Sequence, residues 1–141
     1  QWTDWAKLLF DSGKQYVTWF IENDTSNGTA AITGTAIQFS YSNAQNAWML
    51  ATTHDSIDMK GNSKLCATIQ ITSLHYSSDI NKCGVTSSRP SAGALTDMAW
   101  VASKNLVVGR NDVVIPIDTI DSGYVTIAGI FNGTVEKVWL E

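Results

Sequence analysis

Charge is scarce in this sequence. Charged residues make up 16% of the 141 residues, and the formal net charge is −4. Proteins that bind nucleic acid or an anionic membrane surface normally carry a basic patch, so the composition argues against both partner classes. Long hydrophobic runs are missing too, since no stretch approaches the ~20 apolar residues of a membrane-spanning helix and no basic and then apolar leader follows Gln1. We expect a soluble domain that binds no nucleic acid, inserts into no membrane and is the C-terminal part of a longer chain.

Cysteine and histidine are also rare, which limits the chemistry. Cys66 and Cys83 are too few for a disulfide framework and form no CxxC pair, so they are interpreted as two free buried thiols or as one disulfide. The sequence contains no HExxH, GxSxG or phosphate-binding GxxxxGK motif, and His54 and His75 lie in no recognisable triad context. We predict that the protein is not an enzyme.

Metal-ligand spacing is equally poor. Four aspartates lie near predicted strand ends, where a sandwich can hold a structural calcium ion, but their spacing matches no calcium loop. These residues are Asp97, Asp112, Asp118 and Asp121. We expect no cofactor, with structural calcium as the alternative.

The sequence is rich in tryptophan, with six residues, among many Thr, Ser, Asn and Gly. This mixture favours half-exposed pleated sheets joined by polar turns. Hydrophobic and polar residues alternate with a period of two over Leu65–Thr72 and over Ala30–Tyr41, which a helix face cannot produce. In the second run, Ile37 and Phe39 are expected to face inward. The pattern predicts an all-β fold.

The remaining strand candidates fit the same fold, and Trp2–Phe10 could be a short helix or a strand. The candidates are residues 16–21, 47–54, 83–86, 98–102, 113–117, 124–131 and 135–140. Asn132-Gly133, between the last two, is the strongest hairpin signal, and residues 77–97 apart from 83–86 are expected to form a long loop. About eight or nine strands predict one antiparallel β-sandwich, a jelly roll, over residues 1–141, with 1–10 as a linker or oligomerisation segment.

Aromatic residues favour a binding module, because their rings stack on sugars while polar neighbours bond the hydroxyls. A sandwich also needs bulky core residues, so Trp19, Trp48, Trp100 and Trp139 each have a core alternative, which is strongest for Trp139. The residues predicted to bind carbohydrate are Trp48, His54, Tyr76, Arg89, Trp100 and Arg110.

The end of the chain resembles a known family. Val113–Ile127 followed by Asn132–Glu141, with its strand VEKVWLE, is similar to the end of β-sandwich modules in phage and prophage tail proteins, which commonly finish on V-x-K-[IV]-W-L-E. Leu9–Gly13 resembles their opening LY-[DN]-x-G. Ala51–Met59 with Lys64-Leu65 resembles their TTxxIDLTxYxxL strand pair. The similar segments keep their order and span most of the chain.

This resemblance implies a galactose-binding-like jelly roll of a tail, fibre or baseplate protein, located in the virion or outside the cell. It implies binding to host cell-surface glycan and assembly as a homo-oligomer, a trimer. It supplies no binding residues, and Gln15–Phe20 departs from the family's TSxTGGW segment. Two alternatives stay open. A structural or trimerisation module of the tail tip would touch no sugar and would bury Trp2, Trp5 and Phe10 between subunits, whereas a glycoside hydrolase or its accessory module would need two carboxylates facing each other across a groove.

Overall fold

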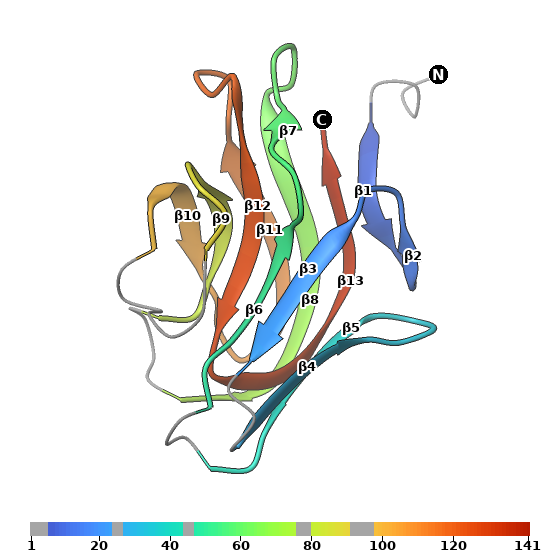
Figure 1. The fold of residues 1–141 in the computed structure, drawn as a ribbon, viewed down its shortest axis with the longest axis vertical. Coiled ribbons are helices and arrows are strands. Elements are labelled where there is room, and N and C mark those ends of the chain that lie inside the picture. Colours follow the sequence, from blue (N-terminus) through green and yellow to red (C-terminus); the bar gives the residue numbers. More distant parts are fainter. Residues whose placement is uncertain (1–5, 24–26, 44–46, 76–79, 91–97) are drawn as a thin grey trace.

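Two antiparallel sheets face each other in the computed structural model of the chain, which describes residues 6–23, 27–43, 47–75, 80–90 and 98–141 (Figure 1). The strands are β1 (Lys7–Asp11), β2 (Lys14–Gln15), β3 (Trp19–Asn23), β4 (Gly28–Ile32), β5 (Ile37–Tyr41), β6 (Met49–Thr53), β7 (Ile57–Asp58), β8 (Lys64–Leu74), β9 (Lys82–Thr86), β10 (Trp100–Asn105), β11 (Gly109–Pro116), β12 (Ser122–Gly129) and β13 (Phe131–Leu140). The part of the chain described here contains no helix long and apolar enough to cross a membrane. The predicted all-β class is confirmed.

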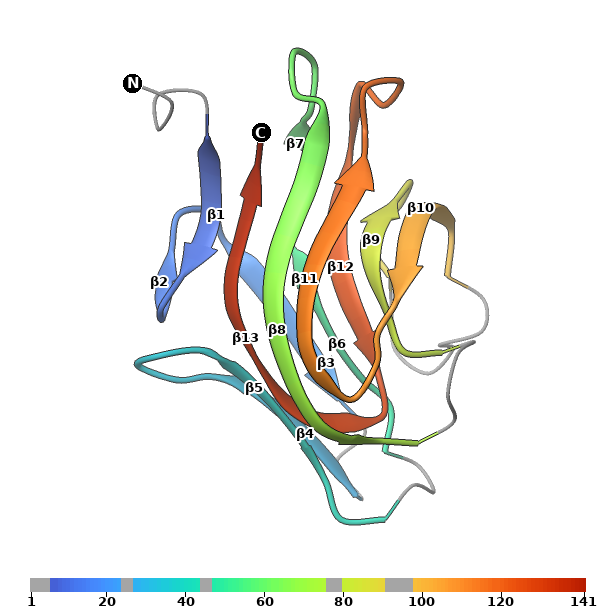
Figure 2. The same cartoon turned by 180° about the vertical axis from the view of Figure 1, so that it is seen from behind.

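The strand order is that of a jelly roll. Sheet A has the order β11-β8-β13-β1-β2, with the β4–β5 hairpin joined to β13 through β5, and sheet B has the order β10-β9-β12-β6-β3, with β7 beside β12. The first strand of the chain therefore lies beside the last, and the chain repeatedly crosses between the sheets. Eight strands, β1, β6 and β8 to β13, make the two four-stranded halves, and five short strands extend them. Figure 2 shows β13, β8 and β11 side by side in sheet A.

The hydrophobic core fills the space between the sheets. On β8, Leu65, Ala67, Ile69 and Ile71 face it and are at most 3% exposed, as the alternation predicts. Ile37 and Phe39 also face inward as predicted. The residues that alternate with these inward ones point outward. Each sheet therefore has an outer face on which a site can form.

The predicted strand over Ala30–Tyr41 is wrong in its middle, because a turn divides it into β4 and β5. The Thr33 backbone N–H donates to Ala36 O at 2.8 Å, and the Thr33 hydroxyl accepts from the Ala36 N–H at 3.0 Å. Local bonds of a threonine side chain compete with a continuous ladder in this way. The two halves pair with each other as a hairpin.

The hairpin prediction at Asn132-Gly133 is also wrong, since both residues lie inside β13 and β12 belongs to the other sheet. The register shifts between them, which marks a β-bulge. Asn132 accepts from the Tyr41 N–H and donates to Ser73 Oγ, both at 2.8 Å. A Cβ at Gly133 would lie 2.3 Å from Gln70 O, so glycine is required for this close approach.

The segment at the start of the chain is a strand where the structure describes it. β1 begins at Lys7, and residues 1–5, including Trp2 and Trp5, lie outside the described residues. Phe10 is fully buried within the domain and meets Trp19 edge to face at 6.3 Å between ring centroids. Phe10 is therefore a core residue and is not available to a subunit interface.

Candidate functional site

The six residues predicted to bind carbohydrate do not form one site. Trp48 precedes β6 and His54 follows it, so the whole strand separates them. Arg110 lies within β11 of sheet A, because this strand begins at Gly109 and not at residue 113, where the predicted strand began.

Three of the six predicted binding residues lie toward one end of sheet B: His54, Arg89 and Trp100. Arg89 Nη1 donates to His54 O at 3.3 Å, and the Arg89 guanidinium lies 5.1 Å from the centroid of the Phe20 ring. Trp100 begins β10, which pairs with β9. Tyr76 lies outside the described residues. Since the His54 side chain is 50% exposed, this group lies at the surface.

The middle of the outer face of sheet B is closed to solvent. Thr52, Thr86 and Thr126 point away from the core there, yet each is 0% exposed. Their hydroxyls bond to each other, with Thr126 Oγ1 at 2.8 Å from Thr52 Oγ1 and at 3.1 Å from Thr86 Oγ1. Buried hydroxyls that satisfy one another stabilise the sheet, so this row is structural.

The outer face of sheet A contains an open hollow of about 280 Å³. Cys66 of β8 is at its floor, opposite Val114 of β11 on one side and Trp139 of β13 on the other. We call it the Trp139 hollow, and its lining is Lys64, Cys66, Ala67, Asp112, Val113, Val114, Trp139 and Glu141. An aromatic wall with polar groups around it has the chemistry that a sugar site needs.

The Trp139 ring is held in one orientation. Its Nε1–H donates to Glu141 Oε2 at 2.8 Å, and Lys137 Nζ lies over the ring at 4.7 Å from the centroid. A ring fixed in advance loses little conformational freedom when a ligand stacks on it.

The core alternative, which was strongest for Trp139 among the tryptophans, is wrong for this residue, because Trp139 is half-buried on the outer face. The register of β13 shifts between Val135 and Lys137, and this bulge moves Val138 and Leu140 to the inner face. Trp139, between them, therefore points outward. The alternation of the polar residues Lys137 and Glu141 around it is the signal that could have identified it.

The polar groups around the hollow are suited to binding hydroxyls. Lys64 offers donors, whereas Asp112 and Glu141 offer acceptors. Arg110, a predicted site residue, joins this rim through an ion pair with Asp112, with Nε 3.0 Å from Oδ1. Both partners are more than half exposed, so the pair itself adds little stability.

The thiols are free and remain protonated at neutral pH. Burial raises the pKa of Cys66, and the nearby Glu141 carboxylate raises it further. Burial raises the pKa of Cys83 to about 12. The free-thiol interpretation is confirmed, and neither thiol is activated as a nucleophile.

We predict that both thiols are protected in the folded protein. Cys66, at the floor of the hollow, should react slowly with Ellman's reagent at pH 8, and Cys83 only after unfolding. The pKa of Cys83 is about 12 in the folded protein and 9.0 in an ordinary thiol. The protonated Cys83 thiol therefore contributes its full stabilisation below pH 9, and this stabilisation is lost as the pH rises toward 12. Labelling of Cys83 in the native protein, read by peptide mapping, would contradict this.

Among the residues that the structure describes, no group of three or more His, Cys, Asp or Glu side chains is arranged to hold a metal ion. Asp112, one of the four aspartates considered for calcium, is engaged with Arg110 instead. Asp97 lies outside the described residues.

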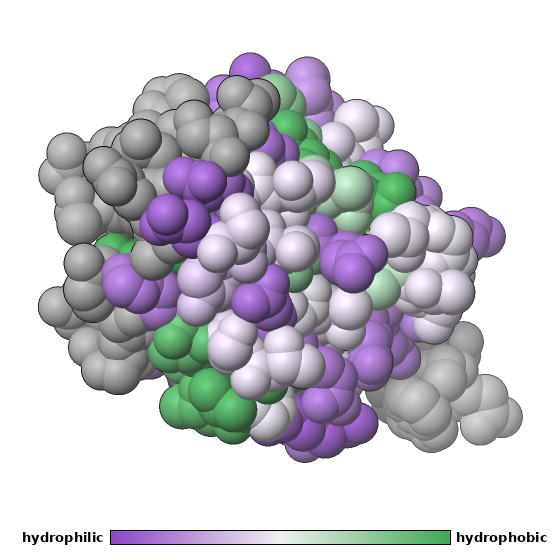
Figure 3. Space-filling view, turned by 90° about the horizontal axis from the view of Figure 1, so that it is seen from below, coloured by the Kyte–Doolittle hydropathy of each residue, from purple (hydrophilic) through white to green (hydrophobic). Residues whose placement is uncertain are grey.

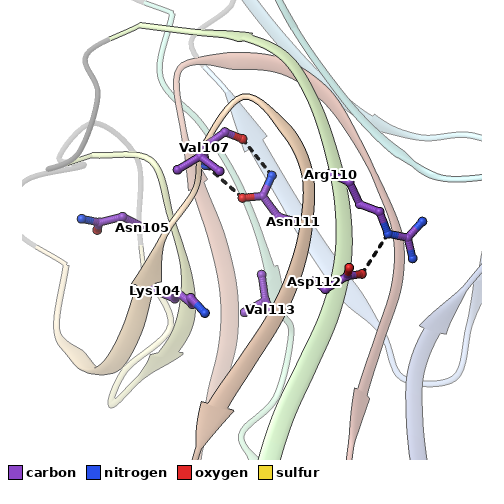
Figure 4. Close-up of a pocket in the computed structure, with 7 residues that line it drawn as sticks. All are labelled: Lys104, Asn105, Val107, Arg110, Asn111, Asp112 and Val113. Carbon is purple, nitrogen blue, oxygen red and sulfur yellow. Dashed lines mark hydrogen bonds and ion pairs between the residues drawn. The ribbon is translucent and has the colours of Figure 1, made fainter.

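A second hollow of about 230 Å³ lies where the edges of the two sheets meet, between β10 and β11 (Figure 4). Asn111 holds its shape, since Oδ1 accepts from the Val107 N–H at 2.9 Å and Nδ2 donates to Val107 O at 2.8 Å. Figure 4 shows Arg110 and Asp112 on one side of β11 and Asn111 on the other. Asp112 borders both hollows.

Comparison with known proteins finds a similar fold and no family. No family model matches this chain, and no curated protein matches it. Among solved structures, the K2 cleaved adhesin domain of Lys-gingipain is similar over 96% of this chain and 89% of its own, with 10% identity and a TM-score of 0.44. A likeness at this level carries no functional argument.

Proposed function

We propose that this domain is a non-catalytic carbohydrate-binding module and that its ligand stacks on Trp139 in the hollow of sheet A. The observation that carries the proposal is the fixed, outward-facing indole beside Lys64, Asp112 and Glu141. An aromatic face with hydroxyl-bonding neighbours matches the amphipathic surface of a pyranose. Asp112 and Glu141 are exposed, so neither lies in the buried apolar setting of a glycosidase general acid.

The biological setting of the proposal comes from the resemblance in the sequence. We place the module in a phage or prophage tail protein, outside the cell, where it recognises host cell-surface glycan. Binding through one shallow hollow is weak, and linking several copies in an oligomer raises the effective concentration. The alternative is a module that assembles the tail tip without contacting sugar.

The proposal predicts that Trp139→Ala weakens glycan binding by about tenfold or more, equivalent to about 1.4 kcal/mol, because the stacking surface is lost. The matched control is Trp100→Ala, which removes an indole from sheet B and should leave binding within about twofold. Wild type and both variants are presented as tetramers on an array of host-wall glycans, after near-ultraviolet circular dichroism has shown that they fold.

The outcomes separate the candidate sites. Loss of binding in Trp100→Ala or Arg89→Ala, with Trp139→Ala unaffected, moves the site to the end of sheet B. Absence of binding to every host-wall glycan, together with unchanged host adsorption when the domain is deleted, overturns the carbohydrate proposal and favours the structural alternative.

A further inference from the structure

β11 is an edge strand with one side unpaired. It is the outermost strand of sheet A and pairs along its whole length, eight residues, with β8. In the described part of the chain, no other strand pairs with it, since the neighbouring β10 belongs to sheet B. The free backbone donors and acceptors of such an edge are a template for another strand.

The surface beside this edge is unusually apolar. Among the described residues, four of the five large hydrophobic side chains that are exposed lie on β10, β11 or the turn between them: Val101, Val107, Val108 and Val114, at 47 to 61% exposure. Figure 3 looks at the molecule from below and shows a patch of exposed hydrophobic residues beside hydrophilic ones. Clustered exposed aliphatic residues mark an interaction surface more often than isolated ones do.

The sequence of β11 identifies the partner. We infer that β11 pairs antiparallel with β11 of a second copy of this chain, across a two-fold axis that passes beside Asn111. In this register Arg110 lies opposite the partner's Asp112, and Asp112 lies opposite the partner's Arg110. The same register sets Val114 opposite the partner's Val108. Opposite charges and aliphatic pairs across two strands both stabilise a sheet, and a two-fold interface requires such reciprocity.

Other registers lack this match. An axis beside Asp112 would place Asp112 opposite its own copy, which like charges disfavour, and an axis beside Val113 would place Asp112 opposite the partner's Val114. An axis between two residues would turn the outer face of one copy toward the core side of the other. The ion pair between Arg110 and Asp112 within one chain is exposed, so sharing its charges with a second copy costs little.

The pairing also deepens the proposed function, on which this step rests. Two copies joined at β11 form one continuous sheet, with their Trp139 hollows on the same outer face. Six strands from β13 to the partner's β13 make five gaps, so the two indoles are separated by about 24 Å across the strands. Two weak sites on one rigid face would bind a polymeric glycan more tightly than one site does.

The experiment is sedimentation velocity on the full chain without glycan, from micromolar to sub-millimolar concentration. We expect an equilibrium between one and two chains of 15.3 kDa. Asp112→Arg should weaken the dimer by about tenfold or more, because four arginines then meet at the axis. Arg110→Asp should do the same with four aspartates. The double variant with both substitutions exchanges the charges but keeps their reciprocity, so it should recover the dimer.

Each result of the sedimentation experiment either supports or overturns the β11 dimer. A monomer at every concentration, a trimer, or a dimer that survives Asp112→Arg overturns it, and so does failure of the double variant to recover association while it folds as judged by circular dichroism. Since the assay contains no sugar, these failures leave the proposed function untouched. Loss of glycan binding in Trp139→Ala likewise says nothing against the dimer.

Discussion

Phe131→Ala should lower the free energy of unfolding by about 3 to 5 kcal/mol, the range seen when a buried aromatic residue is truncated. Phe131 is 0% exposed and stacks on Phe39, with ring centroids 4.6 Å apart and planes 21° apart. Phe39 lies on β5 opposite Gly133 of β13, so the two rings fasten the β4–β5 hairpin to the main sheet. A domain with the usual 5 to 15 kcal/mol of total stability would lose a large part of it.

The measurement is urea unfolding followed by tryptophan fluorescence. Phe39→Ala is the companion variant, and the double variant completes a cycle that isolates the ring contact, for which we expect about 0.5 to 1.5 kcal/mol. A loss below about 1 kcal/mol in Phe131→Ala would show that the hairpin is not fastened by this pair. Phe39→Leu, which keeps most of the volume, should cost clearly less than Phe39→Ala.

Local patterns were enough to predict the class of fold but not its connections. The inward residues of β8 follow directly from a period of two, because alternate side chains of a strand face opposite sides. The pairing of β1 with β13 joins residues from opposite ends of the chain, and a sequence window contains no information about it. The hairpin signal at Asn132-Gly133 failed for a related reason. The residues that decide its geometry, Gln70 and Ser73, belong to a different strand.

The sequence predicted aromatic and polar binding residues, but it did not place them around Trp139. Stacking rings beside hydroxyl-binding groups were expected, and Arg110 is at the rim of the hollow through its pair with Asp112. Trp139 was missed because a bulge in β13 reverses the faces of the residues that follow it. Trp48 and His54 belong to one predicted strand, residues 47–54, but they lie at opposite ends of β6. Periodicity gives a residue's face and not its neighbours.

Asn81→Ala should cost about 3 kcal/mol, since it leaves one buried and one part-buried backbone group without the bonds that this side chain makes. Asn81 is 0% exposed. Its Nδ2 donates to His75 O, which follows β8, and its Oδ1 accepts from the Ile130 N–H between β12 and β13, both at 2.8 Å. Its backbone O accepts from the Leu106 N–H after β10 at 2.8 Å. One residue thus joins three connections that lie at the same end of the sandwich.

The backbone beside the Asn81 side chain leaves room for it only because residue 129 is glycine. Gly129, next to Ile130, has a φ of +155°, and a Cβ there would lie 2.2 Å from Asn81 Oδ1. Glycine is therefore needed where the chain leaves sheet B for sheet A. The jelly-roll crossover depends on a buried polar contact that no hydrophobic pattern could predict.

Asn81→Asp separates the hydrogen bonds from the volume. The carboxylate has the shape of the amide and still accepts from Ile130, but it cannot donate to His75 O and is a buried charge. Burial raises the pKa of such a carboxyl in the folded state, so its proton is lost more readily from the unfolded chain, and stability should rise as the pH falls from 7 toward 4. Wild type carries no such group at this position.

Urea midpoints for wild type, Asn81→Ala and Asn81→Asp at pH 7 and pH 5 test this. The exposed Asn105→Ala is the matched control and should shift stability by less than about 0.5 kcal/mol. We expect Asn81→Asp to regain part of its loss at pH 5, relative to wild type, while Asn81→Ala does not. If Asn81→Ala unfolds at the wild-type midpoint, or if the aspartate variant weakens on acidification relative to wild type, then Asn81 is not the polar junction that connects the two sheets.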